Sequence, residues 1–353
     1  MGQVIITPAG KPSQPAGALA TARVGDWWLY KFSPILATFY ATVGLAGGPL
    51  LPLLGRLLVL LLSLVVGAVY VSIVNDWTDR ADDAAGGKAN RLAGRSPRFI
   101  GLALGSCLLA GGGFGWYFWQ LDQLSALLYL GAWVVYSLYS LPPARLKGRG
   151  LAGVLADAAG AHFFPLLLTV ALAGRWTGQA VPAAWWAAMG AWALAGGIRN
   201  ILWHQLADAD ADAQAGVGTF VRRRGQRLAQ RLGQALAFPV EIGAFGMVLL
   251  LLSQPAWAVA MLGLYGGLEW CRWRIWGYRP AVLAPDSRLV LNDYYQFFFP
   301  LALLLGQARR YPADGLVLVL HAGLFWPSVQ QLGQEAGQYA ALARRKATSR
   351  QAG

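Results

Sequence analysis

The chain has few charged residues for its length. Only 13% of its 353 residues are Asp, Glu, Lys or Arg, whereas soluble domains carry roughly 25%, so an ordinary soluble domain is excluded. With two cysteines, Cys107 and Cys271, the chain also has no disulfide framework, and we expect both thiols to pack among apolar residues. The polar, Pro- and Gly-rich segment 1–26 lacks the apolar core of a signal peptide, so no cleavable signal is expected.

Apolar residues, by contrast, make up 56% of the chain. They recur in runs of about 20 residues, the length of a helix that crosses a bilayer, and they lack the ten-residue alternation of a membrane β-barrel. We therefore predict an all-α, polytopic transmembrane helical bundle of about nine spans, with one short, irregular segment at 293–308; if that segment also crosses the membrane, there are ten spans. The apolar segments are 28–48, 53–75, 99–119, 122–140, 151–173, 183–206, 233–252, 255–271, 293–308 and 314–331.

Basic residues are distributed unevenly over the connections between these segments. The N-terminal part and the even-numbered loops hold twenty Lys and Arg, whereas Arg56 and Arg175 lie in the alternate loops. The positive-inside rule then places the N-terminus and the even-numbered loops in the cytoplasm. The net charge of +13 is explained by this topology and by anionic lipid headgroups, and no nucleic acid partner is expected. The predicted regions are a polar cytoplasmic tail (1–26), a membrane domain (27–332) and a basic C-terminal tail (333–353).

Seven of the 16 carboxylates are gathered in two short windows, at the predicted cytoplasmic ends of the second and sixth spans. Like charges repel, and acids near a membrane are costly, so the clustering requires a cause. A single acidic run at a helix end is usually a solvated surface, but two runs on one side make that explanation weaker. The first window holds Asp76, Asp79, Asp82 and Asp83, and the second holds Asp208, Asp210 and Asp212.

Helical geometry arranges each window into a stripe. At about 100° per residue, Asp76, Asp79 and Asp83 fall within roughly 60° of one another, while Asp82 points away. In the second window two acids lie one turn apart on a face shared with two further polar residues, while the third points nearly opposite. The residues on the shared face are Asp208, Asp212, His204 and Gln205, and the opposite one is Asp210.

Two facing carboxylate stripes favour bound cations. Mg²⁺ prefers hard oxygen ligands and is typically shared with substrate phosphates, so two ions could hold a diphosphate between the stripes. The alternative of an EF-hand calcium loop fails, because Ala213 and Thr219 stand where that pattern needs Gly and Glu. Basic residues suited to phosphate lie nearby, although topology alone also accounts for them. They are Lys88, Arg91, Arg145 and Lys147.

These motifs resemble those of one known family, the UbiA-type membrane prenyltransferases. Asn75-Asp76-x-x-Asp79-x-x-x-Asp83 is similar to the family's first motif, and Asp208-x-x-x-Asp212, followed by Gly216 and Thr219, looks like the second. The segment YSLPPARLKGRG, residues 139–150, is similar to the family segment between them. The similarity covers about residues 30 to 270 and is specific in combination.

The resemblance implies a bundle of about nine spans in two similar halves, each with one aspartate motif, in a bacterial-type inner membrane. It also implies Mg²⁺-dependent transfer of an isoprenoid chain from its diphosphate to a lipophilic acceptor. By position, Asp76, Asp79, Asp83, Asp208 and Asp212 would hold Mg²⁺, Asn75 would assist them, Lys88, Arg91, Arg145 and Lys147 would hold diphosphate, and Tyr139 and Gln205 would contact substrate.

Two departures from the family pattern leave the acceptor open. His204-Gln205 stand where the family usually has an Asn-Asp or similar pair, and Arg91-Leu92 replace a common Arg-Pro pair. His204 is a candidate base or a hydrogen-bonded interior histidine, and Asp157 is an acceptor contact or a residue paired across helices. A quinone-precursor aromatic acid, a tetrapyrrole and a carotenoid end all remain candidate acceptors.

Two other functions are consistent with paired acids in a membrane. A transporter would use them as a cation or proton path, but its acids are expected near mid-depth, whereas these lie at span ends beside basic residues. CDP-alcohol phosphotransferases also use paired aspartates, but their DGxxAR segment is absent from this sequence.

Overall fold

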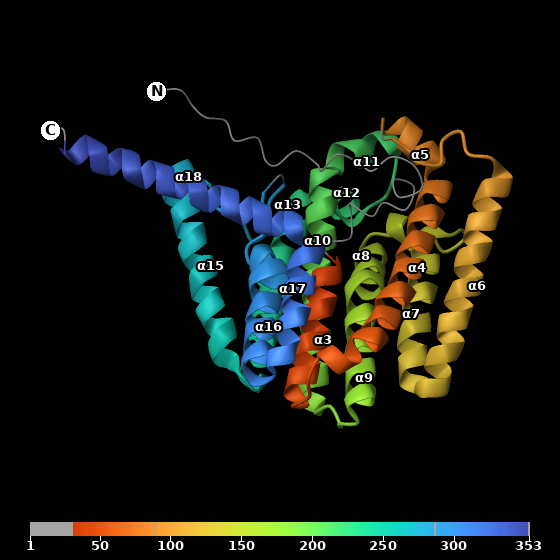
Figure 1. Ribbon diagram of the computed structural model, residues 1–353. Coiled ribbons are helices and arrows are strands. Elements are labelled where there is room, and N and C mark those ends of the chain that lie inside the picture. Colours follow the sequence, from red (N-terminus) through yellow and green to blue (C-terminus); the bar gives the residue numbers. More distant parts are fainter. Residues whose placement is uncertain (1–30, 88, 286, 352–353) are drawn as a thin grey trace.

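The protein is described from a computed structural model, which covers residues 31–87, 89–285 and 287–351. Within these ranges it is an all-helical bundle without β-strands, and two isolated bridges join loops. The helices run up and down between two ends (Figure 1), and the short helices α5 and α11 lie together at one of them. We call this the acidic end. The tail 1–26, the first residues of the segment 28–48, and Lys88 lie outside the described residues.

The chain from its first described helix to the middle loop forms four long or medium helices and several short ones. In order they are α3 (Ser33–Leu45), the 3₁₀ turn Leu51–Leu53, α4 (Leu54–Thr78), α5 (Arg80–Ala85), α6 (Pro97–Leu121), α7 (Gln123–Ser140) and the 3₁₀ turn Leu146–Gly148.

The next part begins with a long helix that contains a π-helical turn. Its elements are α8 (Leu151–Ala158), the π-helical turn Ala159–Phe163, α9 (Phe164–Thr177), α10 (Ala183–Ala207), α11 (Ala209–Ala215), α12 (Phe220–Arg224), α13 (Gln226–Leu232), the π-helical turn Gly233–Ala237 and α14 (Phe238–Leu251).

The last part ends in a long helix outside the bundle. Its elements are α15 (Pro255–Trp276), the π-helical turn Tyr294–Phe298, α16 (Phe299–Arg310), the 3₁₀ turn Pro312–Asp314, α17 (Gly315–Leu324) and α18 (Trp326–Gln351).

Each of the ten apolar segments predicted from the sequence contains a helix. Among the described residues, four continuous helices are long and apolar enough to cross a membrane: Leu51–Thr78, Pro97–Leu121, Leu151–Thr177 and Gln226–Leu251. The helices at Pro312–Leu324 and Trp326–Tyr339 would make a fifth, but they meet at 80°. The last predicted segment, 314–331, is therefore not one straight helix. The number of nine spans stays a prediction.

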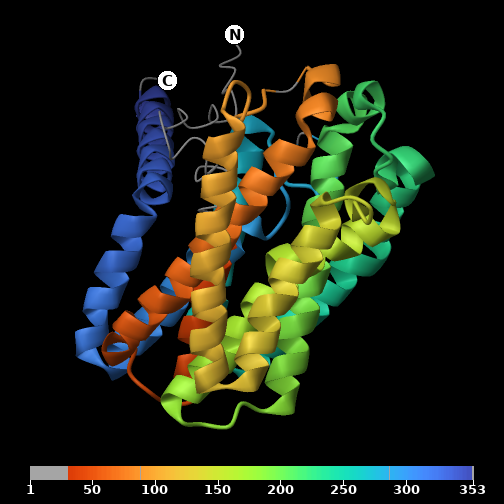
Figure 2. The same cartoon turned by 90° about the vertical axis from the view of Figure 1, so that its right-hand side faces the viewer.

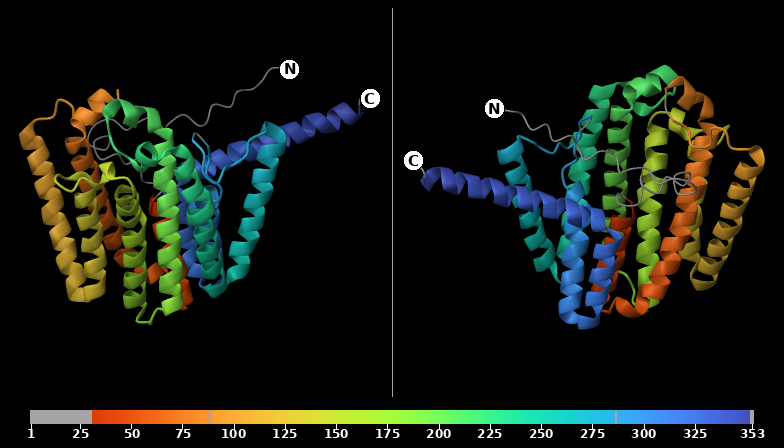
Figure 3. Two further views of the ribbon diagram at one scale, coloured as in Figure 1. Left: turned by 180° about the vertical axis from the view of Figure 1, so that it is seen from behind. Right: turned by 45° about the horizontal axis from the view of Figure 1, so that its top comes forward.

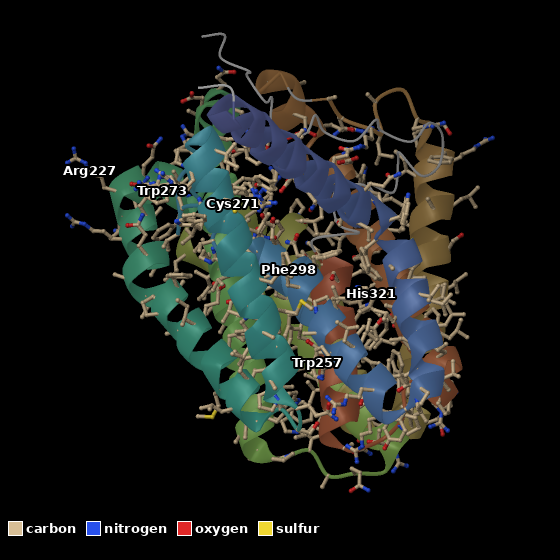
Figure 4. The ribbon with its side chains drawn as sticks, turned by 60° about the vertical axis from the view of Figure 1, so that its left-hand side comes forward. Arg227, Trp257, Cys271, Trp273, Phe298 and His321 are labelled. Carbon is tan, nitrogen blue, oxygen red and sulfur yellow. The ribbon has the colours of Figure 1, made fainter. Side chains whose placement is uncertain are left out.

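Helix α15 shows the spacing expected of a membrane span. Trp257 and Trp273 lie towards its opposite ends (Figure 4), and 16 residues of helix separate them by about 24 Å. Tryptophan is enriched at both membrane interfaces, and the hydrocarbon core is about 30 Å thick. The two rings are therefore separated by slightly less than the thickness of the hydrocarbon core, and a span at α15 stays a prediction.

Small residues let the helices approach one another closely. A Cβ on Gly111 of α6 would lie 2.5 Å from the Trp133 ring of α7, and a Cβ on Gly131 would lie 2.7 Å from Phe164. Packing of this kind, together with hydrogen bonds, holds membrane helices together, because lipid tails remove most of the hydrophobic driving force. A larger residue at either position would force the facing ring to shift.

A buried ion pair ties the second half of the bundle together. Glu241 on α14 accepts hydrogen bonds from the Arg199 guanidinium on α10, from Nε at 2.6 Å and from Nη2 at 2.7 Å. The two side chains are 0% and 2% exposed. Arg199 also donates to the Val282 carbonyl and to Asn292, so it anchors the connection that follows α15.

At the end opposite the acids, an aspartate organises the connections. Asp314 is fully buried and accepts hydrogen bonds from the backbone N–H groups of Leu50 and Leu51, at 2.9 and 2.8 Å. Arg309 and Arg310, which close α16, also lie at this end, because the Tyr311 hydroxyl bonds to the Gly47 carbonyl. These two arginines lie at the end predicted to face away from the cytoplasm, so they weaken the positive-inside assignment.

Helix α18 leaves the bundle at the acidic end and extends sideways beyond α15 (Figures 1 and 3). Its departure is fixed by Arg272 of α15, which is 2% exposed and donates to both carboxylate oxygens of Glu335. Arg272 also contacts Glu269 and Asp293. A buried, fully paired arginine therefore sets the direction of the last helix.

Candidate active site

The two acid clusters occupy equivalent joints between a long helix and a short one. Asp79 separates α4 from α5 with φ −99° and ψ 4°, and Asp208 separates α10 from α11 with φ −93° and ψ 6°. Both preceding helices have 25 residues. One local structure is thus repeated in two parts of the chain, as expected if each half carries one aspartate motif.

The two short acidic helices pack against each other. A Cβ on Gly86, which ends α5, would lie 3.2 Å from the Ala211 carbonyl oxygen and 3.7 Å from the Ala215 Cβ of α11. Figures 1 and 2 show the two helices side by side at the same end of the bundle. The sequence separates these motifs by more than one hundred residues, and the fold brings them into contact.

Tyr139, near the end of α7, links the two clusters electrostatically. Its phenol is close enough to Asp79 of the first motif and to Asp212 of the second for Coulombic interaction with both, and with Asp157 as well. Tyr139 therefore lies within electrostatic range of carboxylates from both motifs.

Two basic side chains from the loop after α7 reach into the first cluster. Arg145 Nη2 lies 2.7 Å from Asp82 Oδ2 and 3.3 Å from Asp79 Oδ1. Lys147 is 8% exposed and pairs with Asp79, and its Nζ is 3.8 Å from Asp82. The predicted diphosphate-binding residues Arg145 and Lys147 therefore lie directly at the acids.

The backbone at Arg145 is in the left-handed region, with φ 36° and ψ 57°. This conformation costs a residue other than glycine on the order of 1–3 kcal/mol and is concentrated at functional sites. The preceding Pro142–Pro143 peptide is cis. The strained turn aims the guanidinium at Asp79 and Asp82.

The prediction that Asp82 points away from the other acids is wrong. The spacing of an uninterrupted helix predicts that Asp82 points away from Asp76, Asp79 and Asp83, and Asp82 is not among the predicted site residues. In the structure the helix ends at Thr78 and restarts at Arg80, so α5 has its own direction. Asp82 consequently faces Arg145 and belongs to the ion-pair network.

The other residues of the first motif are held in place by polar neighbours that the sequence analysis missed. Asn75 Oδ1 accepts a hydrogen bond from the Ser140 hydroxyl. Asn90 donates from Nδ2 to Asp83 Oδ2 at 2.8 Å and to the Asp76 carbonyl at 2.6 Å. Asp76 itself is only 5% exposed. Asn90 folds the loop back over the motif. Its role could not be predicted from the sequence, because Asn90 lies seven residues after Asp83 in a loop.

The second motif is anchored through backbone contacts. Gln205 is 4% exposed, and its Oε1 accepts from the Val221 N–H at 3.3 Å. Thr219 forms an isolated bridge with Gly150, whose N–H donates to the Gly218 carbonyl at 3.3 Å. The loop carrying Lys147 is thus joined to the loop that follows α11. Gln205 serves here as a structural contact.

The remaining predicted residues have different surroundings. His204 is exposed and its ring packs edge-on against Trp203, with centroids 4.9 Å apart. Arg91 is half-buried in the turn after α5, and Lys88 lies outside the described residues. Asp208 and Asp210 are both exposed.

Asp157 lies beneath the acidic end, one residue before the end of α8. Its carboxylate interacts electrostatically with Lys31 and with His204. The position inside the bundle agrees with the intramembrane acid expected from the sequence, and charged partners accompany it.

No closed metal cage marks this end in the described part of the chain. No three His, Cys, Asp or Glu side chains among the described residues are grouped closely enough to hold a metal ion by themselves. A pocket of about 300 Å³ lies at the opposite end, lined by Asp122, Arg175 and Trp186 among others. The acids of the two motifs take no part in it.

Comparisons with known proteins agree with this architecture. A model of the UbiA prenyltransferase family matches residues 35–292. The fold is similar to that of a UbiA homolog from Archaeoglobus fulgidus bound to GPP and Mg²⁺, with 17% identity, a TM-score of 0.52, and coverage of 83% of this chain and 95% of that one. A UbiA homolog from the same organism bound to Cd²⁺ gives 18% identity, a TM-score of 0.50, and coverage of 80% and 97%. No curated protein gives a significant match.

Proposed function

Because the chain belongs to the UbiA prenyltransferase family, we propose that it is an integral membrane enzyme that transfers an isoprenoid chain from its diphosphate to a lipophilic acceptor. The observation that carries the proposal is the contact between α5 and α11, which joins both aspartate motifs beside Arg145 and Lys147. Carboxylates bind divalent cations and basic side chains bind a diphosphate, so the two together at one end of the bundle can bind a ligand that combines both.

The donor set at this end fits Mg²⁺. All candidate ligands are carboxylate oxygens, which hard cations prefer, and Mg²⁺ usually takes one or two carboxylates together with substrate phosphates. A preformed cage of three acids is therefore not needed. When bound, the ions would offset the charge that develops on the departing diphosphate. The residues that would hold them are Asp76, Asp79, Asp83, Asp208 and Asp212.

Arg145 and Lys147 would hold the diphosphate. Both side chains pair with Asp79 and Asp82 in the structure. A bound diphosphate would replace these carboxylates as the negatively charged partner of Arg145 and Lys147. Arg145 offers a planar pair of donors and Lys147 a compact point charge. By their sequence positions, Arg91 and Lys88 belong to the loop that would cover the same ligand. Lys88 lies outside the described residues.

The chemistry divides into bond breaking and bond making. The C1–O bond of the allylic diphosphate breaks, and its electron pair leaves with the diphosphate into the field of Arg145 and Lys147. An electron pair of the acceptor then forms the bond to C1, and the acceptor loses a proton. The site lies at the end of the bundle that carries most of the loop arginines, so we place it on the cytoplasmic side.

The direct test is reconstitution of the purified protein in liposomes. With radiolabelled geranyl diphosphate, Mg²⁺ and membrane lipid extract, label should move into a diphosphate-free lipid. A transporter that uses the acids as a cation path would instead carry ions across the liposome without any prenyl donor. Ion flux together with absence of label transfer would reject the enzyme function.

A further inference from the structure

The last helix, α18, lies across the acidic end of the bundle, in a part of the chain that the family model does not match. That match ends at residue 292, whereas α18 begins at Trp326. Helix α17 runs between the two ends of the bundle (Figure 1), and the first part of α18, Trp326–Tyr339, meets it at 80°. If the bundle axis follows the membrane normal, as in other helical membrane proteins, α18 lies close to the membrane plane.

The first part of α18 has two different faces. One face is partly covered by the bundle, and the opposite face is exposed and consists of uncharged polar residues and glycines. This division is the one expected of a helix that lies on a surface with its outer side in water. The partly covered residues are Ser328, Val329, Leu332, Glu335 and Tyr339, and the exposed polar ones are Gln330, Gln331, Gln334 and Gln338.

Two contacts hold α18 against the last turns of α15. Arg272 donates from Nη2 to Glu335 Oε2 at 2.8 Å, and the rings of Trp276 and Tyr339 lie with their centroids 4.9 Å apart. The neighbouring Trp273 is 39% exposed (Figure 4). Because tryptophan is enriched where membrane meets water, α18 crosses α15 at the level expected for lipid headgroups.

The helix continues past α15, and this part of it is basic. Trp276 ends α15, so residues 340–351, which follow Tyr339, extend about 18 Å beyond the contact between the two rings. Figures 1 and 3 show this end of α18 outside the bundle, with none of the other described helices beneath it. We call residues 340–351 the basic extension. Its sequence contains no Asp or Glu, and its basic residues are Arg344, Arg345, Lys346 and Arg350.

A helix in the membrane plane, beside the bundle and at the level of the interface, has lipid headgroups next to it. The cytoplasmic leaflet is anionic, and clusters of about four to eight basic residues on such helices bind its headgroups. We infer that the basic extension is a docking surface for anionic lipids of the leaflet at the acidic end. Helix α18 is then held by Arg272 in its middle and by headgroups at its end. This binding is separate from prenyl transfer and does not depend on it.

Fluorescence quenching tests whether the basic extension lies on lipid. Ala347→Cys, in a chain that also carries Cys107→Ala and Cys271→Ala, is labelled with a fluorophore. Single protein molecules are placed in nanodiscs of phosphatidylcholine, with or without about 30% of the anionic lipid phosphatidylglycerol. Acrylamide, a neutral quencher in the water, should quench the label at least about twofold less in the anionic discs, because bound headgroups shield it. Salt at about 1 M shortens the Debye length to about 3 Å and should remove this difference.

Two sets of variants separate the basic extension from the other positive charges. Changing its four basic residues to glutamine should abolish the difference between the two kinds of disc. Changing four exposed arginines elsewhere at the acidic end to glutamine removes the same charge and should leave the difference intact. The first set is Arg344→Gln, Arg345→Gln, Lys346→Gln and Arg350→Gln, and the control set is Arg98→Gln, Arg224→Gln, Arg227→Gln and Arg231→Gln.

Four results would overturn the inference. A label that is quenched fully in both kinds of disc lies in water. A label shielded equally in both is covered by something other than anionic headgroups. Shielding that appears only in liposomes with many protein copies, and not in single-molecule discs, assigns the surface to a second copy of the chain. An equal loss of the difference in the control set shows a general effect of net charge.

Discussion

Asp79 and Asp208 hold equivalent positions, each between a 25-residue helix and a short acidic helix, with nearly identical backbone torsions. The equivalence extends to the positions three residues earlier, where Asp76 and Gln205 are 5% and 4% exposed. Gln205 uses its amide to bind the Val221 N–H. The second motif therefore has a buried amide in a backbone contact where the first motif has a buried carboxylate, so the two motifs are similar without being identical.

Asp208, at the joint between α10 and α11, should be essential, whereas Asp210 on α11 should not. Asp208→Ala removes a predicted cation ligand, and we expect the rate of prenyl transfer to fall by about 100-fold or more, the scale seen when a charge-stabilising group is removed. Asp210→Ala is the matched control and should stay within about twofold. Radiolabel transfer in liposomes measures both, and comparable losses in the two variants would contradict the assignment.

Removing divalent cations should abolish turnover reversibly. EDTA should stop transfer and weaken geranyl diphosphate binding, because Arg145 and Lys147 alone do not neutralise a diphosphate beside several carboxylates. Added Mg²⁺ should restore both activities. Donor binding and transfer that persist in EDTA would show that basic side chains suffice.

Lys147 should contribute mainly to donor binding. Its ammonium is buried against Asp79, where a charge interaction is weakly screened. Lys147→Met should raise the KM for geranyl diphosphate by about tenfold or more, since hydrogen bonds to charged groups are among the stronger ones. Arg98→Met provides the control, because Arg98 is exposed at the start of α6. An unchanged KM in Lys147→Met would remove this residue from the diphosphate site.

The contact between α5 and α11 should be necessary for activity. Gly86→Val places a branched side chain where a Cβ alone would be 3.2 Å from the Ala211 carbonyl, so it should push the two motifs apart. Displacements of about 1 Å can reduce activity by about 100-fold, and we expect a loss approaching that size without loss of folding. Gly113→Val, on an open face of α6, should be nearly silent. A fully active Gly86→Val would show that the motifs act separately.

The Arg199–Glu241 pair should matter for stability and not for chemistry. Glu241→Ala leaves a buried guanidinium without its bidentate partner, which typically costs about 3–5 kcal/mol, so thermal unfolding in detergent should occur at a clearly lower temperature. The double change Arg199→Met with Glu241→Met should recover much of that loss, because no charge is then left buried. If Glu241→Ala unfolds like the wild type, the pair makes no net contribution.

The positions of the helices follow from the sequence alone, and so does the prediction of the main site residues. Runs of about 20 apolar residues require helices, because backbone groups in lipid must be satisfied within the segment, and Asp76, Asp79 and Asp83 share a face at helical spacing. Only the tertiary structure decided what depends on helix breaks and on neighbours far apart in the chain. The break at Asp79 turned Asp82 toward Arg145, the bend at Phe325 sent α18 out of the bundle, and helix packing joined α5 to α11. A periodic pattern describes one straight helix, and these features arise where helices bend or meet.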